Sequence, residues 1–143
     1  ALNISETEQE LRGGIDMLHA ETGNPVGVTG FCMGGALALF AACQNSNKVG
    51  ACVDFYGIHP NVEYDWDSLT APVLGLWAEH DDMVNPQLTG FAEALASRQH
   101  NFHFKTYPGT AHAFFNDTNT EGHDVEASAD AWELTLEWFA RYL

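Results

Sequence analysis

The sequence predicts an α/β domain of three layers, in which a sheet of about four parallel strands has helices on both faces. Short apolar runs alternate along the 143 residues with longer segments of helical spacing, as in chains built from β-α units. The first three of these runs are continuously apolar, which is typical of strands buried in a parallel sheet. No linker, repeat or low-complexity segment interrupts the alternation, so residues 1–143 are expected to form one domain.

The first helix is expected to begin near Ser5, because Ser5 to Glu8 resembles a capping box. Apolar residues then follow at helical spacing: Leu11, Ile15 and Leu18. Strands are expected near residues 25–29, 49–54, 72–78 and 102–107. The last of these alternates apolar and polar residues, so we expect it at an edge of the sheet.

Three further helices are expected between and after these strands. An apolar helix follows the first strand, from Met33 to about Gln44, and another begins at Asn85 and Pro86, since proline favours a first helical turn. In the C-terminal helix, five residues at helical spacing are expected to face the core: Val125, Ala129, Trp132, Leu136 and Phe139.

The segment from Gly30 to Gly35 (GFCMGG) carries the strongest chemical signal. It joins a predicted strand to a predicted helix, with Cys32 on the sharp turn between them, which is the arrangement of a nucleophile elbow with cysteine in place of serine. A strained turn needs neighbours with little side chain, and Gly30 and Gly34 lie two residues to either side of Cys32. The turn also places Cys32 at a helix N-terminus, where a thiolate is favoured.

Two later segments supply an acid and a base. Asp81 and Asp82 follow the third predicted strand, and His112 follows the fourth. Nucleophile, acid and histidine in this order are typical of α/β hydrolases. Asp81 is favoured as the acid, with Asp82 as the alternative.

At this point the chain resembles the dienelactone hydrolase (carboxymethylenebutenolidase-like) family of α/β hydrolases. The resemblance rests on four stretches and runs through essentially the whole chain: residues 30–35 (GFCMGG), 55–57 (FYG), 78–84 (AEHDDMV) and 112–117 (HAFFND). It implies an α/β-hydrolase core in which Cys32 is the nucleophile, His112 the base and Asp81 the carboxylate that orients the base. The N–H of Met33 would belong to the oxyanion hole, and we expect Phe31, Tyr56 and Phe114 to line the substrate site.

The resemblance also implies differences. Family members carry strands ahead of the point at which Ala1 begins, so the chain is expected to be an N-terminally truncated form. The second oxyanion donor lies in the missing part, and the position of a substrate-binding arginine is occupied by Asn116.

We expect a hydrolase of carboxylic esters or lactones that works through a covalent acyl-enzyme. The alternative is a catalytically impaired remnant that acts as an oligomeric binding or assembly module, and a redox sensor at Cys32 ranks last. The first strand would have an open edge, so a homodimer that covers it is expected.

Composition limits the possible partners and the compartment. Twenty Asp and Glu against five Lys and Arg give a net charge of −15, which argues against nucleic acid and anionic membranes as partners. The acidity fits either a very soluble enzyme or a salt-rich habitat. With no signal peptide or spanning segment in the sequence, and three cysteines without repeated spacing, a cytoplasmic location is expected. Cys43 and Cys52 are interpreted as core residues.

No cofactor or metal is expected. The pairs His80 with Asp81 or Asp82, His100 with His103, and His123 with Asp124 lack the spacing of known metal sites. The acidic aromatic stretch 63–67 is interpreted as a solvated loop, with a substrate-lining role for Tyr64 or Trp66 as the alternative.

Overall fold

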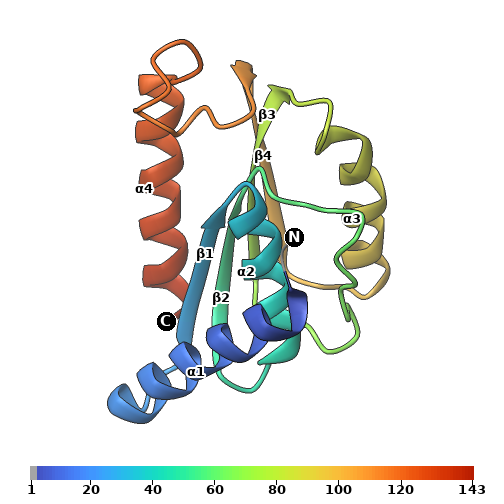
Figure 1. Cartoon of the computed structure of the whole chain (residues 1–143), viewed down its shortest axis with the longest axis vertical. Helices are drawn as coiled ribbons and strands as arrows, with labels where there is room; N and C mark the ends of the chain where they lie inside the picture. The colour runs from blue at the N-terminus through green and yellow to red at the C-terminus, as the bar shows by residue number, and fades with distance from the viewer. Residues whose placement is uncertain (1–2) are drawn as a thin grey trace.

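The computed structural model describes residues 3–143 and shows a parallel four-stranded sheet between two layers of helices (Figure 1). The strands are β1 (Val26–Phe31), β2 (Val49–Phe55), β3 (Val73–His80) and β4 (Phe102–Ala111), paired in the order β1-β2-β3-β4. The helices are α1 (Ile4–Thr22), α2 (Met33–Gln44), α3 (Asn85–Ser97) and α4 (Val125–Tyr142). The predicted three-layer α/β architecture is confirmed, and β4 lies at an edge as expected.

The two faces of the sheet have separate cores. On one face, buried residues of α1, α2 and α3 pack with Cys52, Val73 and Trp77. On the other face, α4 packs alone against Val53 and Leu74 of the same two strands. Because successive side chains of a strand point to opposite faces, the continuous apolar runs of β2 and β3 supply both cores at once. This is why these two strands are central.

The beginning of α1 differs from the prediction. The N-cap is Asn3, whose side chain accepts hydrogen bonds from the backbone N–H groups of Ser5 and Glu6, so the predicted capping box at Ser5 is wrong. Asparagine is as good an N-cap as serine, and here it comes two residues earlier. Of the predicted apolar stripe only Ile15 is buried, and Leu18 is 45% exposed.

The face that α4 turns toward the sheet also differs from the prediction. Its buried residues are small: Ala127, Ser128, Ala131 and Thr135. Val125, Trp132 and Leu136, which were expected in the core, are among the exposed large apolar residues of the described chain. Small side chains let the helix lie close to the sheet, where the ring of Phe139 lies against Gly27 in β1. The large apolar face of α4 therefore looks outward.

The outer edge of β1 is unpaired within residues 3–143, since β1 pairs with β2 alone. A groove of about 510 Å³ runs beside this edge, between α1 and the segment formed by β1 and α2. Its lining is largely apolar and includes Leu11, Leu18, Val28 and Leu37. The open edge expected from the sequence is present in the structure.

Candidate active site

Cys32 lies on the turn between β1 and α2, with φ 56° and ψ −124°. A left-handed φ is unfavourable for a residue with a side chain, so the surrounding contacts must hold the turn in place. The Cys32 N–H donates to the carbonyl of Phe55, and its own carbonyl accepts from the N–H groups of Gly35 and Ala36. The thiol is exposed at the end of the sheet where the strands finish.

Glycines allow the strands and α2 to approach this turn. A Cβ at Gly30 would lie 2.0 Å from the carbonyl oxygen of Gly34, so glycine is required there, as predicted. A Cβ at Gly34 would meet nothing within 4 Å, so the predicted steric need at that position is wrong. The other close approaches are at Gly35, beside Asp54, and at Gly57, beside the carbonyl of Cys32. The sequence reasoning did not identify these two glycines.

A chain of hydrogen-bonding distances links Cys32 to a buried carboxylate. The Nε2 of His112 lies 3.0 Å from the Sγ of Cys32, and its Nδ1 lies 2.6 Å from the Oδ2 of Asp81. The other oxygen of Asp81 accepts from the N–H groups of Met83 and Val84 at the turn before α3. The imidazole is therefore held between the thiol and a carboxylate that is itself fixed by the backbone.

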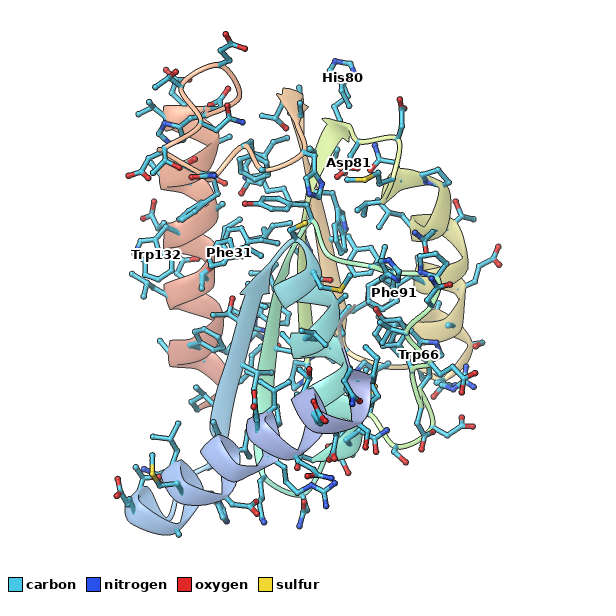
Figure 2. The ribbon with its side chains drawn as sticks, in the orientation of Figure 1. Phe31, Trp66, His80, Asp81, Phe91 and Trp132 are labelled. Atoms are coloured by element: carbon cyan, nitrogen blue, oxygen red, sulfur yellow. The ribbon has the colours of Figure 1, made fainter. Side chains whose placement is uncertain are left out.

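Asp81, and not its neighbour, contacts the histidine. Asp81 is 3% exposed, whereas Asp82 is exposed and makes no side-chain hydrogen bond among the described residues. Figure 2 shows Asp81 at the end of β3, with the preceding His80 pointing away from the sheet. The choice of Asp81 over Asp82 therefore agrees with the geometry.

Met33 is the first residue of α2 and follows Cys32 directly. N–H groups in a first helical turn have no partner inside their helix. None of the backbone hydrogen bonds found among residues 3–143 outside the regular elements uses the N–H of Met33. This N–H is therefore available for an oxyanion, as the sequence led us to expect.

Cys32 lies between two cavities. One, of about 630 Å³, extends toward α4, and its lining includes four large aromatic residues: Phe31, Tyr56, Phe115 and Trp132. The other, of about 470 Å³, extends toward α3 and is lined by His112 and by apolar residues such as Ile58, Met83 and Val84. Cys32 and Tyr56 line both. A substrate centred on the thiol would therefore have a separate space on each side.

Two of the three predicted lining residues reach these cavities. Phe31 and Tyr56 do, but Phe114 is fully buried and packs on Tyr56 and Tyr107 at centroid distances of 5.4 and 5.1 Å. Ala113 has φ 65°, and the turn at this residue sends Phe114 into the core and Phe115 to the cavity. A positive φ at an alanine cannot be foreseen from the sequence.

Tyr64 and Trp66 belong to a different region. Tyr64 stacks on Trp66, with centroids 4.7 Å apart, and Trp66 stacks on Phe91 of α3 at 5.0 Å. They line a small cavity of about 180 Å³ that does not include Cys32. Their predicted alternative role as substrate-lining residues is not supported by this position.

Asp54 and Tyr56 are the two titratable groups near the elbow with shifted pKa values. Burial raises the pKa of Asp54 well above its ordinary value, with a smaller opposing effect of the Gly57 backbone. Burial, and secondarily the electrostatic effect of Cys32, raises the pKa of Tyr56 to about 12. The phenol of Tyr56 is therefore protonated near neutral pH, and burial favours the protonated form of Asp54. The sequence did not indicate a role for Asp54, because this residue occurs in an apolar run that is typical of a buried strand.

Positive charge is absent from both cavities that contain Cys32. None of the five Lys and Arg lines either one. Four of them pair with acids elsewhere: Arg12 with Glu8, Lys48 with Asp16, Arg98 with Asp67, and Lys105 with Asp130.

Within residues 3–143, no group of three or more His, Cys, Asp or Glu is arranged to hold a metal ion. No helix in this range combines the length and the apolar character needed to cross a membrane.

Comparison with known proteins shows which family the chain is similar to. The sequence model of the dienelactone hydrolase family matches residues 5–143. The chain is 34% identical over 119 residues to the protein usf of Aquifex pyrophilus, and 30% identical over 127 residues to a carboxymethylenebutenolidase of Rhodococcus opacus. In each case the alignment covers 82% of this chain. It covers 52% of the Aquifex protein and 50% of the Rhodococcus protein.

A solved dienelactone hydrolase from Anabaena variabilis superposes with a TM-score of 0.74 at 25% identity. The match covers 99% of this chain and 62% of that one. The chain therefore spans about half the length of the curated relatives that it matches.

Proposed function

The chain belongs to the dienelactone hydrolase family, and from this we propose that it hydrolyses carboxylic ester or lactone bonds through Cys32, His112 and Asp81. Cys32 acts as the nucleophile, His112 as general base and then general acid, and Asp81 orients the imidazole. The observation that carries the proposal is the continuous contact from Sγ through the imidazole to the buried carboxylate, with distances of 3.0 and 2.6 Å.

In the first half of the reaction His112 takes the thiol proton and the Cys32 sulfur attacks the carbonyl carbon, forming a C–S bond. The carbonyl oxygen becomes an oxyanion, to which the N–H of Met33 donates. The intermediate then collapses: the C–O bond of the ester breaks, and the leaving oxygen takes the proton from His112. The product of this half is an acyl-enzyme thioester.

In the second half, water attacks the thioester carbonyl while His112 takes a proton from it. The C–S bond breaks, the carboxylic acid leaves, and the thiol recovers its proton from His112. Asp81 stabilises the imidazolium in both halves, and the Met83 and Val84 N–H groups hold its carboxylate in place. A nucleophilic thiol must remain reduced, so we propose the cytoplasm as the compartment.

The proposal is tested by the turnover of p-nitrophenyl acetate. Cys32→Ala and His112→Ala are each expected to lower kcat by at least about a thousandfold, because each removes a group that the others need. His103→Ala, at an exposed histidine on β4, is the control and is expected to retain activity. Retention of turnover by Cys32→Ala would exclude the thiol as nucleophile.

A matched pair tests the carboxylate. Asp81→Asn is expected to lower kcat by on the order of 100- to 10,000-fold, because a neutral amide no longer fixes the tautomer or balances the imidazolium. Asp82→Asn removes a neighbouring exposed carboxylate and is expected to retain nearly full activity. Equal effects of the two substitutions would contradict the role of Asp81.

A second candidate function is supported by the unpaired edge of β1. An open strand edge invites pairing with another chain, so we also propose a homodimer formed at this edge. If the esterase test fails for native protein, assembly through this edge becomes the favoured function of the chain.

A further inference from the structure

The two cavities beside Cys32 differ in which catalytic group they contain. His112 lines the cavity toward α3 and does not line the one toward α4. In the proposed acyl transfer, His112 gives its proton to the leaving oxygen, so the leaving group must lie on the side of His112. The acyl group is then directed to the opposite side, into the cavity toward α4.

The walls of this acyl-side cavity come from four separate parts of the fold. Phe31 ends β1, Tyr56 follows β2, Phe115 follows β4, and Trp132 comes from α4. Their rings form a connected surface. The ring centroid of Phe31 lies 5.2 Å from that of Phe115 and 6.4 Å from that of Tyr56, and the centroids of Phe115 and Trp132 are 6.1 Å apart. Figure 2 shows Phe31 between β1 and α4, with Trp132 on α4 at the same level.

The exposure of two of these rings is unusual for their size. Phe31 is 39% exposed and Trp132 is 45% exposed. An aromatic ring between them would bury apolar surface on both and could make offset or edge contacts with them. The cavity volume of about 630 Å³ falls in the range of small-molecule sites.

The charges around the same cavity select against anions. Its ionisable residues apart from Cys32 and Tyr56 are Asp117 and His123, and no Lys or Arg lines it. A carboxylate on the acyl group would lose water against the aromatic wall without gaining a Lys or Arg partner, since the other polar groups of the lining are those of Asn116, His123 and Ser128. It would also face Asp117 in a protein of net charge −15.

We propose that the cavity of Phe31, Tyr56, Phe115 and Trp132 is an acyl subsite for uncharged aryl acyl groups, and that Trp132 determines this specificity. The inference rests on the acyl transfer proposed above, because that reaction directs the leaving group to His112. The substrates are neutral esters or thioesters whose acyl part carries an aromatic ring, such as arylacetyl esters.

The test compares three esters that share p-nitrophenol as leaving group and differ in the acyl part: acetyl, phenylacetyl and 4-carboxyphenylacetyl. The native protein is expected to favour phenylacetyl over acetyl by about tenfold in kcat/KM, as one or two aromatic contacts would give. The carboxylated ester is expected to fall about tenfold below phenylacetyl, since its charge gains no Lys or Arg partner in the cavity and faces Asp117. Equal rates for the three acyl groups would overturn the proposal.

Trp132→Ala is expected to bring the ratio of phenylacetyl to acetyl close to one. Leu136→Ala is the matched control, because Leu136 lies one turn further along the exposed face of α4 and does not line the cavity. It is expected to keep the native ratio. An unchanged ratio in Trp132→Ala would overturn the role of this residue.

A binding measurement separates failure of the subsite from failure of the reaction. Cys32→Ala is titrated with uncharged phenylacetamide and with phenylacetate anion, observed by saturation-transfer NMR. The subsite is supported if Cys32→Ala binds the amide and the double variant Cys32→Ala, Trp132→Ala does not. This holds even if no variant turns over ester. Cys32-dependent turnover without amide binding overturns the subsite and leaves the acyl transfer intact. If Trp132→Ala changes the oligomeric state but not the acyl ratio, the aromatic surface is a protein contact and the proposal fails.

Discussion

Asp54 is a carboxyl group in the interior of the molecule with no hydrogen-bond partner for either side-chain oxygen among the described residues. It lies on β2 beneath the first turn of α2, where a Cβ at Gly35 would come 2.0 Å from its Oδ1. An ionised carboxylate is costly in such a place, so burial raises the pKa of the group, and the Gly57 backbone lowers it by less. Its protonation is therefore linked to the stability of the fold.

The sign of this linkage gives a prediction. The unfolded chain releases the Asp54 proton above about pH 4, while the folded protein keeps it, so the folded state binds more protons. Stability is therefore lost as pH rises from the ordinary carboxyl pKa toward the raised one. Asp54→Asn removes the effect, so the native protein should lose stability relative to this variant as the pH rises above the ordinary carboxyl pKa.

Urea denaturation at several pH values measures this difference. Asp82→Asn serves as the control, because it removes an exposed carboxylate of the same type. If the native protein and the Asp54→Asn variant show parallel dependence on pH, the Asp54 carboxyl is already ionised in the folded state and the interpretation is wrong.

Single residues also show what the sequence could reveal of the site. Cys32, Asp81 and His112 were predicted to meet, because each follows a strand of a parallel sheet and such strands end at one edge. In the structure His112 lies within hydrogen-bonding distance of both Asp81 and Cys32. Phe115 and Trp132 were not foreseen as cavity residues, since the turn at Ala113 and the rotation of α4 are set by tertiary packing.

At the level of elements, the turn between β1 and α2 depends on Gly30 for close packing. The hypothetical Cβ at Gly30 meets backbone atoms of Gly34 and Gly35, which cannot move aside as a flexible side chain can. We therefore expect Gly30→Ala to lower the free energy of unfolding by about 2 kcal/mol or more, as overpacking does. The substitution should also disturb the position of Cys32.

Gly34→Ala is the matched comparison for this prediction. A Cβ there enters open space, and alanine is favoured over glycine in a helix by up to about 1 kcal/mol. We expect no loss of stability in chemical denaturation. A loss in Gly34→Ala as large as that in Gly30→Ala would show that glycine is needed at both positions for conformational reasons, as the sequence pattern first suggested.

Elements also differ in how well the sequence defines their faces. Strand positions were predicted within a few residues because their apolar runs are bounded by polar loops. In α4 the sequence predicts the large apolar residues on the inner face, yet the structure buries the smaller residues Ala127, Ala131 and Thr135. Hydrophobic spacing cannot distinguish two faces when small residues pack close to a sheet and large residues lie on the exposed face.

At the scale of the whole molecule, the two edges of the sheet are different in character. β4 carries Lys105 and Pro108, features that discourage pairing with another chain. β1 (VGVTGF) has no charge, lies beside an apolar groove, and is unpaired on its outer side within residues 3–143. Of the two edges, β1 is therefore the better place for association between copies.

We predict a dimer through β1 in light scattering at micromolar concentrations. Thr29→Lys, at an exposed position of this strand, is expected to shift the protein to monomer, since two like charges would meet at a two-fold interface. Thr106→Lys places the same charge on the exposed face of β4 and should leave the dimer intact.

Raising the salt concentration should strengthen the native dimer, because it screens the repulsion between copies of net charge −15. A native protein that stays monomeric across the micromolar range at high salt would rule out this interface and leave the β1 edge unpaired in solution.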